Sequence, residues 1–199
     1  MTMNNKVAIL FDGAFFRKRF YTLNNRNPRT SDVQDTINDV MTRVTALTVH
    51  QNSNDILFRA FYYDCRPFGE KKKRPNGTEI DFSNEPSYRA SSAFQNDLKL
   101  FPQMALRLGD LSFDGWKIDD KNPGHFKPDF KQKSVDIKIG LDIAWMSSKK
   151  TVDKLVLIAG DSDFVSPMKF ARKEGILVYL YHMEHIVKMS LKEHADFIL

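Results

Sequence analysis

Acidic residues follow two apolar runs of the sequence, at points where strands are expected to end. Asp12 comes directly after the run Val7–Phe11, and Gly160–Asp163, which reads Gly-Asp-Ser-Asp, follows the run Leu155–Ala159. A third acid, Asp136, stands at the beginning of a segment with helical spacing. Because ligands of open parallel sheets bind beyond the carboxyl ends of the strands, we expect these acids to meet at one sheet edge. The acids are Asp12, Asp136, Asp161 and Asp163.

Several carboxylates in one pocket repel one another, and this repulsion decides what chemistry they can do. At a separation of ~4 Å, two unit charges cost about 4 kcal/mol at an effective dielectric constant of about 20. A hard divalent cation removes this penalty, and Mg²⁺ prefers carboxylate oxygens together with the phosphates of a substrate. One or two such ions polarise a phosphodiester and activate water for its hydrolysis. The acids therefore predict a metal-dependent hydrolase that acts on phosphodiester bonds.

Each acid also has a structural interpretation. Asp12 is suited to cap the helix that follows it, and Asp163 to cap a helix that starts at Phe164. Asp136 in a first helical turn would interact favourably with the helix dipole. Capping is the commoner role for any single Asp, but acids in three separate segments favour a shared site. Asp142 follows six residues after Asp136 and falls on another helix face, so we expect it outside that site.

The alternation of apolar runs with helical spacing predicts an α/β fold, with a mainly parallel central sheet and helices on both faces. Expected strands cover residues 7–11, 55–63, 111–118, 154–160, 176–181 and 197–199. Expected helices cover residues 14–21, 32–47, 88–108, 135–146, 164–173 and 187–193, the third of them kinked or split at Pro102. Residues 24–31, 64–87 and 119–132 are expected to be loops.

The composition indicates one globular domain over residues 1–199, with a polar, basic insertion around residues 64–87. Hydrophobic residues make up 42% of the chain and charged residues 28%, which argues against disorder. The single cysteine, Cys65, excludes an intrachain disulfide and fits a reducing compartment. No apolar run is long enough for a membrane span or a signal peptide, so we expect a cytoplasmic protein without a membrane partner. The net charge of +5 permits a polyanionic partner, and a homo-oligomer is compatible with the sequence.

Several blocks of the chain resemble the NYN domain family, and more narrowly its bacterial LabA-like branch, also called DUF88. This family belongs to the PIN-like nuclease superfamily. The blocks are spread over nearly the whole chain, whereas residues 24–54 and 66–131 match only in general layout. They are Val7–Gly13 (VAILFDG), Phe58–Asp64 (FRAFYYD), Gln132–Asp142 (QKSVDIKIGLD) and Leu155–Tyr181 (LVLIAGDSDFVSPMKFARKEGILVYLY).

The resemblance implies a PIN-like, Rossmann-like three-layer fold and a ribonuclease, expected to be an endoribonuclease, that depends on Mg²⁺ or Mn²⁺. It implies that RNA is the substrate and that the family's acids serve as catalytic residues and metal ligands. Ser162 is placed to hydrogen-bond a ligand or water, and Lys133 matches the family lysine, a candidate phosphate contact. The family's acids match Asp12, Asp136, Asp161 and Asp163.

Departures from the family pattern leave a second function open. Family members often carry a polar residue, commonly Asn, shortly after the first Asp-Gly, whereas Ala14–Phe16 follow here, and the family's usual Gly after the lysine is Ser134. The alternative is therefore a catalytically weak or inactive NYN domain that binds RNA or a protein as a regulatory module. A haloacid-dehalogenase-like phosphohydrolase with Asp12 as nucleophile is disfavoured, because its usual second acid, two residues later, is Ala14 here.

The densest positive stretch of the chain lies inside the expected loop at residues 64–87. It consists of Lys71, Lys72, Lys73 and Arg74. Much of the non-specific affinity of proteins for nucleic acids comes from basic side chains that neutralise phosphates, so this stretch could bind RNA. A solvated loop explains the basic residues equally well. His182 and His185 follow an expected strand without a zinc-ligand pattern around them, which favours surface or capping positions. The aromatic side chains among residues 15–21 are expected to pack on the sheet rather than to stack on bases.

Overall fold

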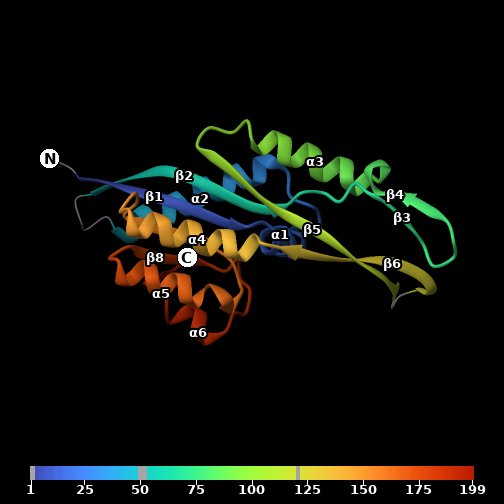
Figure 1. Cartoon of the computed structure of the whole chain (residues 1–199). Helices are drawn as coiled ribbons and strands as arrows, with labels where there is room; N and C mark the ends of the chain where they lie inside the picture. The colour runs from blue at the N-terminus through green and yellow to red at the C-terminus, as the bar shows by residue number, and fades with distance from the viewer. Residues whose placement is uncertain (1–2, 49–52, 120–121) are drawn as a thin grey trace.

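The computed structural model describes residues 3–48, 53–119 and 122–199, along which strands and helices alternate (Figure 1). The strands are β1 (Met3–Asp12), β2 (Ser53–Cys65), β3 (Lys71–Lys73), β4 (Glu79–Asp81), β5 (Met104–Asp119), β6 (Asn122–Lys133), β7 (Lys154–Ile158), β8 (Leu177–Tyr181) and β9 (Phe197–Ile198). The helices are α1 (Gly13–Asn24), α2 (Thr30–Thr48), α3 (Pro86–Leu98), α4 (Val135–Ser148), α5 (Val165–Lys173) and α6 (Met189–Lys192). The short 3₁₀ turns used below are η2 (Phe82–Asn84) and η3 (Ser162–Phe164).

The main sheet has the strand order β6-β5-β2-β1-β7-β8-β9. Only the pair β5–β6 is antiparallel among the neighbours in this sheet, so the predicted mainly parallel sheet is confirmed. After β1 the chain builds the β2 side of the sheet first and then returns to place β7 on the other side of β1. The carboxyl end of β1, where Asp12 lies, is therefore a topological switch point, the usual ligand position in such sheets.

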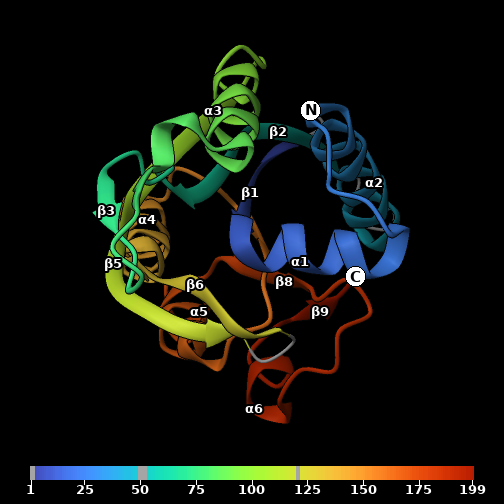
Figure 2. The ribbon, with the colours of Figure 1, turned by 90° about the vertical axis from the view of Figure 1, so that its right-hand side faces the viewer.

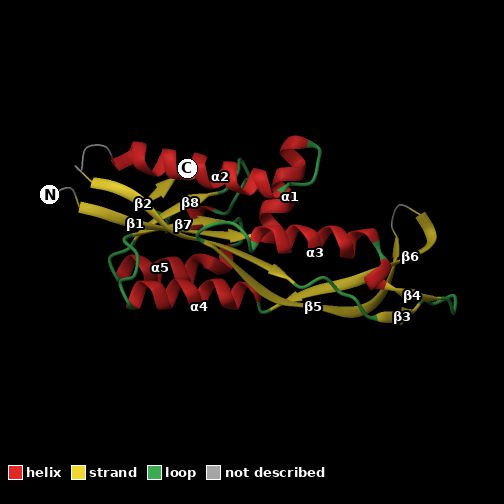
Figure 3. Ribbon diagram, turned by 90° about the horizontal axis from the view of Figure 1, so that it is seen from above, coloured by secondary structure: helices red, strands yellow, loops and turns green. Residues whose placement is uncertain are grey.

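Helices cover both faces of the sheet, as predicted (Figures 2 and 3). Along β1, Ala8 and Leu10 pack into the cluster that holds α4 and α5, whereas Ile9 and Phe11 pack into the cluster that holds α1 and α2. All four side chains have no exposed surface, which is why this strand reads as a continuous apolar run. Among the described residues, no helix combines the length and the apolar character that a membrane crossing requires.

The expected helix at residues 88–108 is wrong in its second half. Helix α3 ends at Leu98 and β5 starts at Met104, which pairs in parallel with Ala60 of β2. Pro102 cannot continue a helix, and Gln103 has a left-handed φ of 59°, so the chain reverses between the two elements. The expected strand at residues 111–118 is the distal part of this longer β5.

The expected loop at residues 119–132 is also wrong, because most of it forms β6; residues 120 and 121 lie outside the described residues. Beyond its contact with β2, β5 pairs with β6 as an antiparallel ribbon that extends past the sheet (Figure 3). Pro128 pairs with Trp116 next to a register shift, and β6 is an edge strand, so the missing N–H of proline is tolerated there.

The polar insertion at residues 64–87, expected as a loop, contains the β3–β4 hairpin and η2. Gly77, with φ at 84°, belongs to the turn of this hairpin. A cluster of aromatic rings joins the insertion to the β5–β6 ribbon, with ring centroids 5.2 to 6.3 Å apart. The cluster comprises Phe68, Phe82, Phe113, Trp116 and Phe130.

Candidate functional site

The first acid of the site lies where β1 passes directly into α1. The Oδ1 atom of Asp12 accepts hydrogen bonds from the backbone N–H groups of Ala14 and Phe15, both at 3.1 Å, so Asp12 does cap α1. Gly13 is required at this junction, because a Cβ there would lie 2.4 Å from the carbonyl oxygen of Tyr63. Capping uses one carboxylate oxygen of Asp12; its Oδ2 has no hydrogen bond to the described part of the chain.

The second pair of acids lies beyond the end of β7. Asp161 caps the turn η3, with its Oδ1 accepting from the N–H of Asp163 at 3.0 Å. The expected capping role of Asp163 is therefore wrong, because the turn begins at Ser162, two residues before the predicted helix, and contains Asp163. Asp163 instead lies within η3, exposed to solvent.

The third segment enters from the β5–β6 ribbon. Lys133 ends β6, Ser134 adopts a left-handed φ of 68°, and α4 begins at Val135. This sharp junction places Asp136 in the first turn of α4, as predicted, with its side chain exposed. The left-handed backbone explains why a glycine suits the position of Ser134.

The acids of these segments lie close enough to raise one another's pKa. Burial raises the pKa of Asp12 to about 6, and the negative charges of Asp136 and Asp161 add to the rise, against the lowering effect of its backbone hydrogen bonds. Although Asp136 stays exposed, partial loss of hydration beside the neighbouring segments raises its pKa, and the charges of Asp161 and Asp163 raise it further. No ion pair within residues 3–48, 53–119 and 122–199 neutralises any of these four carboxylates. The result is a region of uncompensated negative charge at the switch point.

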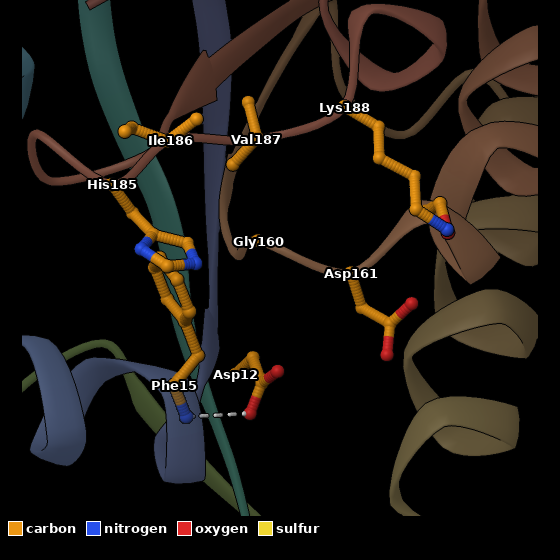
Figure 4. Close-up of a pocket in the computed structure, with 9 residues that line it drawn as sticks. Asp12, Phe15, Gly160, Asp161, His185, Ile186, Val187 and Lys188 are labelled. Atoms are coloured by element: carbon orange, nitrogen blue, oxygen red, sulfur yellow. Dashed lines mark hydrogen bonds between the residues drawn. The ribbon is translucent and has the colours of Figure 1, made fainter.

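An open cleft of about 410 Å³ lies against these acids (Figure 4). Asp12 and Asp161 contribute carboxylates to its wall, and Ser162 contributes a hydroxyl. The ammonium of Lys188 reaches the Oγ of Ser162 at 3.3 Å. The complete lining is Asp12, Phe15, Gly160, Asp161, Ser162, His185, Ile186, Val187 and Lys188.

The loop that follows β8 supplies lining residues that the sequence did not indicate. His185 is exposed, as expected, but it lines the cleft and its ring lies 5.8 Å from that of Phe15, centroid to centroid. Ile186 is 92% exposed at the same rim. No short sequence motif identifies this loop as part of the site. The loop reaches the cleft because β8, which it follows, lies two strands from β1 in the sheet.

The other predicted site residues lie away from the cleft lining. Lys133 is exposed where β6 meets α4. The basic stretch forms β3 and the start of its turn, in a hairpin at the far end of the ribbon (Figures 1 and 3). Its first lysines are paired, Lys71 with Glu79 at 3.8 Å and Lys72 with Glu70 at 2.8 Å. Lys73 and Arg74 are exposed.

The donor set suits some metal ions better than others. Among the described residues, no three His, Cys, Asp or Glu side chains are grouped closely enough to hold a metal ion by themselves. This does not suit Zn²⁺, which takes three or four protein ligands. Mg²⁺ needs fewer protein ligands, because it keeps several waters and binds through one or two carboxylates plus substrate phosphates. Asp12 and Asp161, which line the same cleft without a cationic partner, are such carboxylates.

Comparison with known proteins identifies the family. A model of the NYN domain matches residues 92–199, more than half of the chain. The chain belongs to the NYN domain family. The matched range includes Asp136, Asp161 and Asp163, whereas Asp12 lies before it. NYN domains have a PIN-like fold and are generally nucleases, so the predicted family and fold are confirmed, while the LabA-like branch stays a prediction.

The fold as a whole also resembles a solved structure. A crystal structure of a protein of unknown function from Vibrio parahaemolyticus RIMD 2210633 matches with a TM-score of 0.54 and 18% sequence identity. The match covers 98% of this chain and 91% of that chain. At this identity the likeness concerns the fold alone. No curated protein sequence matches the chain.

Proposed function

We propose that this NYN domain is a metal-dependent ribonuclease that hydrolyses RNA phosphodiester bonds at the acidic cleft. The observation that carries the proposal is that Asp12 and Asp161, from separate segments, line one cleft and that no ion pair neutralises them in the described chain. The charges of Asp136 and Asp161 also raise the pKa of Asp12. Acids that only capped helices would not need to share one region of the sheet edge. Membership of a family that generally consists of nucleases supports the hydrolytic class.

Asp12 and Asp161 are the residues best placed to hold a divalent ion, with Asp136 and Asp163 close enough to add negative charge. A bound ion supplies Lewis acidity and activates water for attack on phosphorus. Each of the two lining acids keeps one oxygen on backbone N–H groups, which fixes the direction of the other oxygen. Lys188 donates to the Oγ of Ser162, so the hydroxyl hydrogen of Ser162 remains available for a phosphate oxygen.

The test is cleavage of labelled RNA in the presence of Mg²⁺ or Mn²⁺. We expect the wild-type protein to cut the RNA and Asp161→Asn to lose about 100-fold or more of the rate, because several kcal/mol of charge stabilisation disappear. Asp97→Asn, an exposed acid of α3, serves as the control and should keep wild-type activity. Equal activity of wild type and Asp161→Asn would contradict the proposal.

A regulatory module that binds RNA without cutting it is the second candidate. One observation favours it: the aromatic side chain of Phe15 lines the cleft at a place where family members often carry polar residues. This candidate requires RNA binding that survives EDTA, together with no cleavage at any concentration of Mg²⁺ or Mn²⁺. Cleavage abolished by Asp161→Asn excludes it.

A further inference from the structure

The cleft has two chemically different sides, with the carboxylates between them. In Figure 4, Asp12 and Asp161 lie between the side chains of Phe15 and His185, which are in contact, on one side and Lys188 on the other. The side of Lys188 also carries the hydroxyl of Ser162 and is polar. The opposite side consists of two rings and the apolar side chain of Ile186.

The charges at the cleft do not by themselves attract a polyanion. Two carboxylates and one ammonium line it, and further acids lie nearby. Even with a divalent ion bound, this balance supplies little of the phosphate neutralisation that drives non-specific binding to nucleic acids. A nucleic acid that occupies the cleft must therefore gain affinity from contacts other than those of its phosphates. The ring-bearing side offers such contacts, since stacking of bases on side chains is insensitive to charge.

The loop that presents this side is held in place from several directions. Arg19 of α1 donates two hydrogen bonds, at 3.1 and 2.9 Å, to the carbonyl oxygen of Met183. Met183 and Glu184 both adopt left-handed φ angles, 48° and 57°, which a non-glycine residue keeps only where its surroundings enforce them. Val187 is buried in the core on the far side of the loop. Ile186 is thus an apolar side chain, 92% exposed, on a loop anchored at both ends.

The contact between Phe15 and His185 leaves ring surface free. Their rings meet at an interplanar angle of 63°, an edge contact, so Phe15 supports the His185 ring without covering both of its faces. Gly160 makes room for this arrangement, because a Cβ there would lie 2.4 Å from the Phe15 ring and 3.2 Å from that of His185. A flat ligand in the cleft can therefore lie against the free face of His185, with Ile186 at the rim of the same cleft.

We propose that Phe15, His185 and Ile186 form a platform that binds one unpaired nucleobase of single-stranded RNA, next to the phosphodiester that faces the acids. This inference rests on the proposed ribonuclease function and adds the part of the substrate that the cleft recognises. The base stacks on His185 and packs against the apolar side chain of Ile186, with Phe15 as support, while Lys188 and Ser162 contact the backbone. A base inside a duplex has both faces covered by its neighbours, so the platform selects single strands.

Binding in EDTA separates this platform from catalysis, because no turnover is needed. The probes are a fluorescein-labelled single-stranded RNA decamer and an abasic decamer with the same backbone. We expect Ile186→Ala and His185→Ala to weaken binding of the RNA decamer about tenfold each, the range for loss of one stacked base. Neither variant should change binding of the abasic decamer, and Ile186→Phe should tighten binding of the RNA decamer alone. Lys188→Ala should weaken both probes equally.

Leu100, 81% exposed and two residues after the end of α3, provides the matched control, and Leu100→Ala should bind both probes as the wild type does. The platform is wrong if the wild type binds both decamers equally or binds neither. It is also wrong if Ile186→Ala behaves like Leu100→Ala. A wild type that prefers the RNA decamer but never cuts RNA with Mg²⁺ or Mn²⁺ would instead retain the platform and refute the ribonuclease. Circular dichroism of each variant establishes that it is folded.

Discussion

Arg17 and Asp64 form an ion pair with two hydrogen bonds that joins α1 to the end of β2. Asp64 is only 3% exposed and also accepts a hydrogen bond from Gln95 of α3 at 3.1 Å. The carboxylate therefore ties three elements together. Because α1 begins directly after Asp12, this pair fixes the helix whose first N–H groups hold that acid.

Asp64→Asn should destabilise the protein, because it leaves the guanidinium of Arg17 without its counter-charge. Loss of one partner of a fully buried pair costs ~3–5 kcal/mol, and we expect about 2–3 kcal/mol here because Arg17 keeps 35% of its side-chain surface exposed. Thermal unfolding measures the loss as a Tm lower by roughly 4–12 °C. The exposed pair of Asp39 and Arg43 provides the control, and Asp39→Asn should change Tm by no more than about 2 °C. A similar change in both variants would contradict a structural role for the Arg17–Asp64 pair.

Asp12→Asn should stabilise the protein at alkaline pH and not at acid pH. The folded-state pKa of Asp12 is about 6, above its ordinary value of 3.8, so the folded state binds the proton more tightly than the unfolded state does. Stability therefore falls as the pH rises from about 4 to about 6, by about 2–3 kcal/mol in all. Asparagine cannot ionise and still caps a helix. Melting curves should show equal Tm values near pH 4 and a higher Tm, by roughly 4–12 °C, for the variant near pH 8.

Mg²⁺ should raise the Tm of the wild-type protein, because an ion that binds only the folded state stabilises it. The gain is about 2.7 kcal/mol at a free concentration of 100 times Kd. Asp136→Asn and Asp161→Asn should both reduce the rise, whereas the control Asp97→Asn should leave it unchanged. If neither site variant alters the Mg²⁺-induced shift, the acids do not share an ion.

Ser134→Gly should stabilise the junction between β6 and α4. Ser134 adopts a left-handed φ of 68° and its side chain makes no capping hydrogen bond, so a Cβ there brings strain without compensation. Glycine gives the unfolded chain more conformational entropy, which lowers stability, but relief of the strain outweighs this cost by about 0.5–1 kcal/mol. The net gain raises Tm by roughly 1–4 °C. Ser148→Gly, within the last turn of the same helix, is the control and should lower Tm. A lower Tm for Ser134→Gly would show that the hydroxyl has a role that its hydrogen bonds do not reveal.

The double variant Lys73→Ala/Arg74→Ala should weaken binding of long RNA only. No residue of the β3–β4 hairpin lines the cleft, and the hairpin is at the far end of the ribbon (Figure 3), so we expect a pentanucleotide to bind the variant and the wild type equally. Loss of two phosphate contacts lowers the slope of log K against log[salt] by about 1.4 for a single strand. Titration of an RNA of about 30 nucleotides at several salt concentrations measures this slope. Lys71→Ala/Lys72→Ala removes lysines that already pair with Glu79 and Glu70, and it should change the slope less. A larger change in slope for Lys71→Ala/Lys72→Ala than for Lys73→Ala/Arg74→Ala would contradict a role of Lys73 and Arg74 in phosphate binding.

Local pattern alone was enough for the elements that carry the acids. The apolar runs before Asp12 and Asp161 form β1 and β7, and the segment from Val135 forms α4, as predicted. The spacing of apolar residues predicts such elements, because it shows whether a strand is buried on both faces or a helix on one. β6 was missed because Pro128 reads as a strand breaker, and only its pairing at a register shift of an edge strand makes it tolerable.

The sequence by itself determined the α/β class, the family and which aspartates follow strands, since these depend on neighbours along the chain. Tertiary structure decided which segments meet. It placed the loop of His185 and Lys188 against the aspartates and divided the basic stretch into paired and exposed residues. Strand order and register are set by contacts between residues distant along the chain, so no local pattern encodes them.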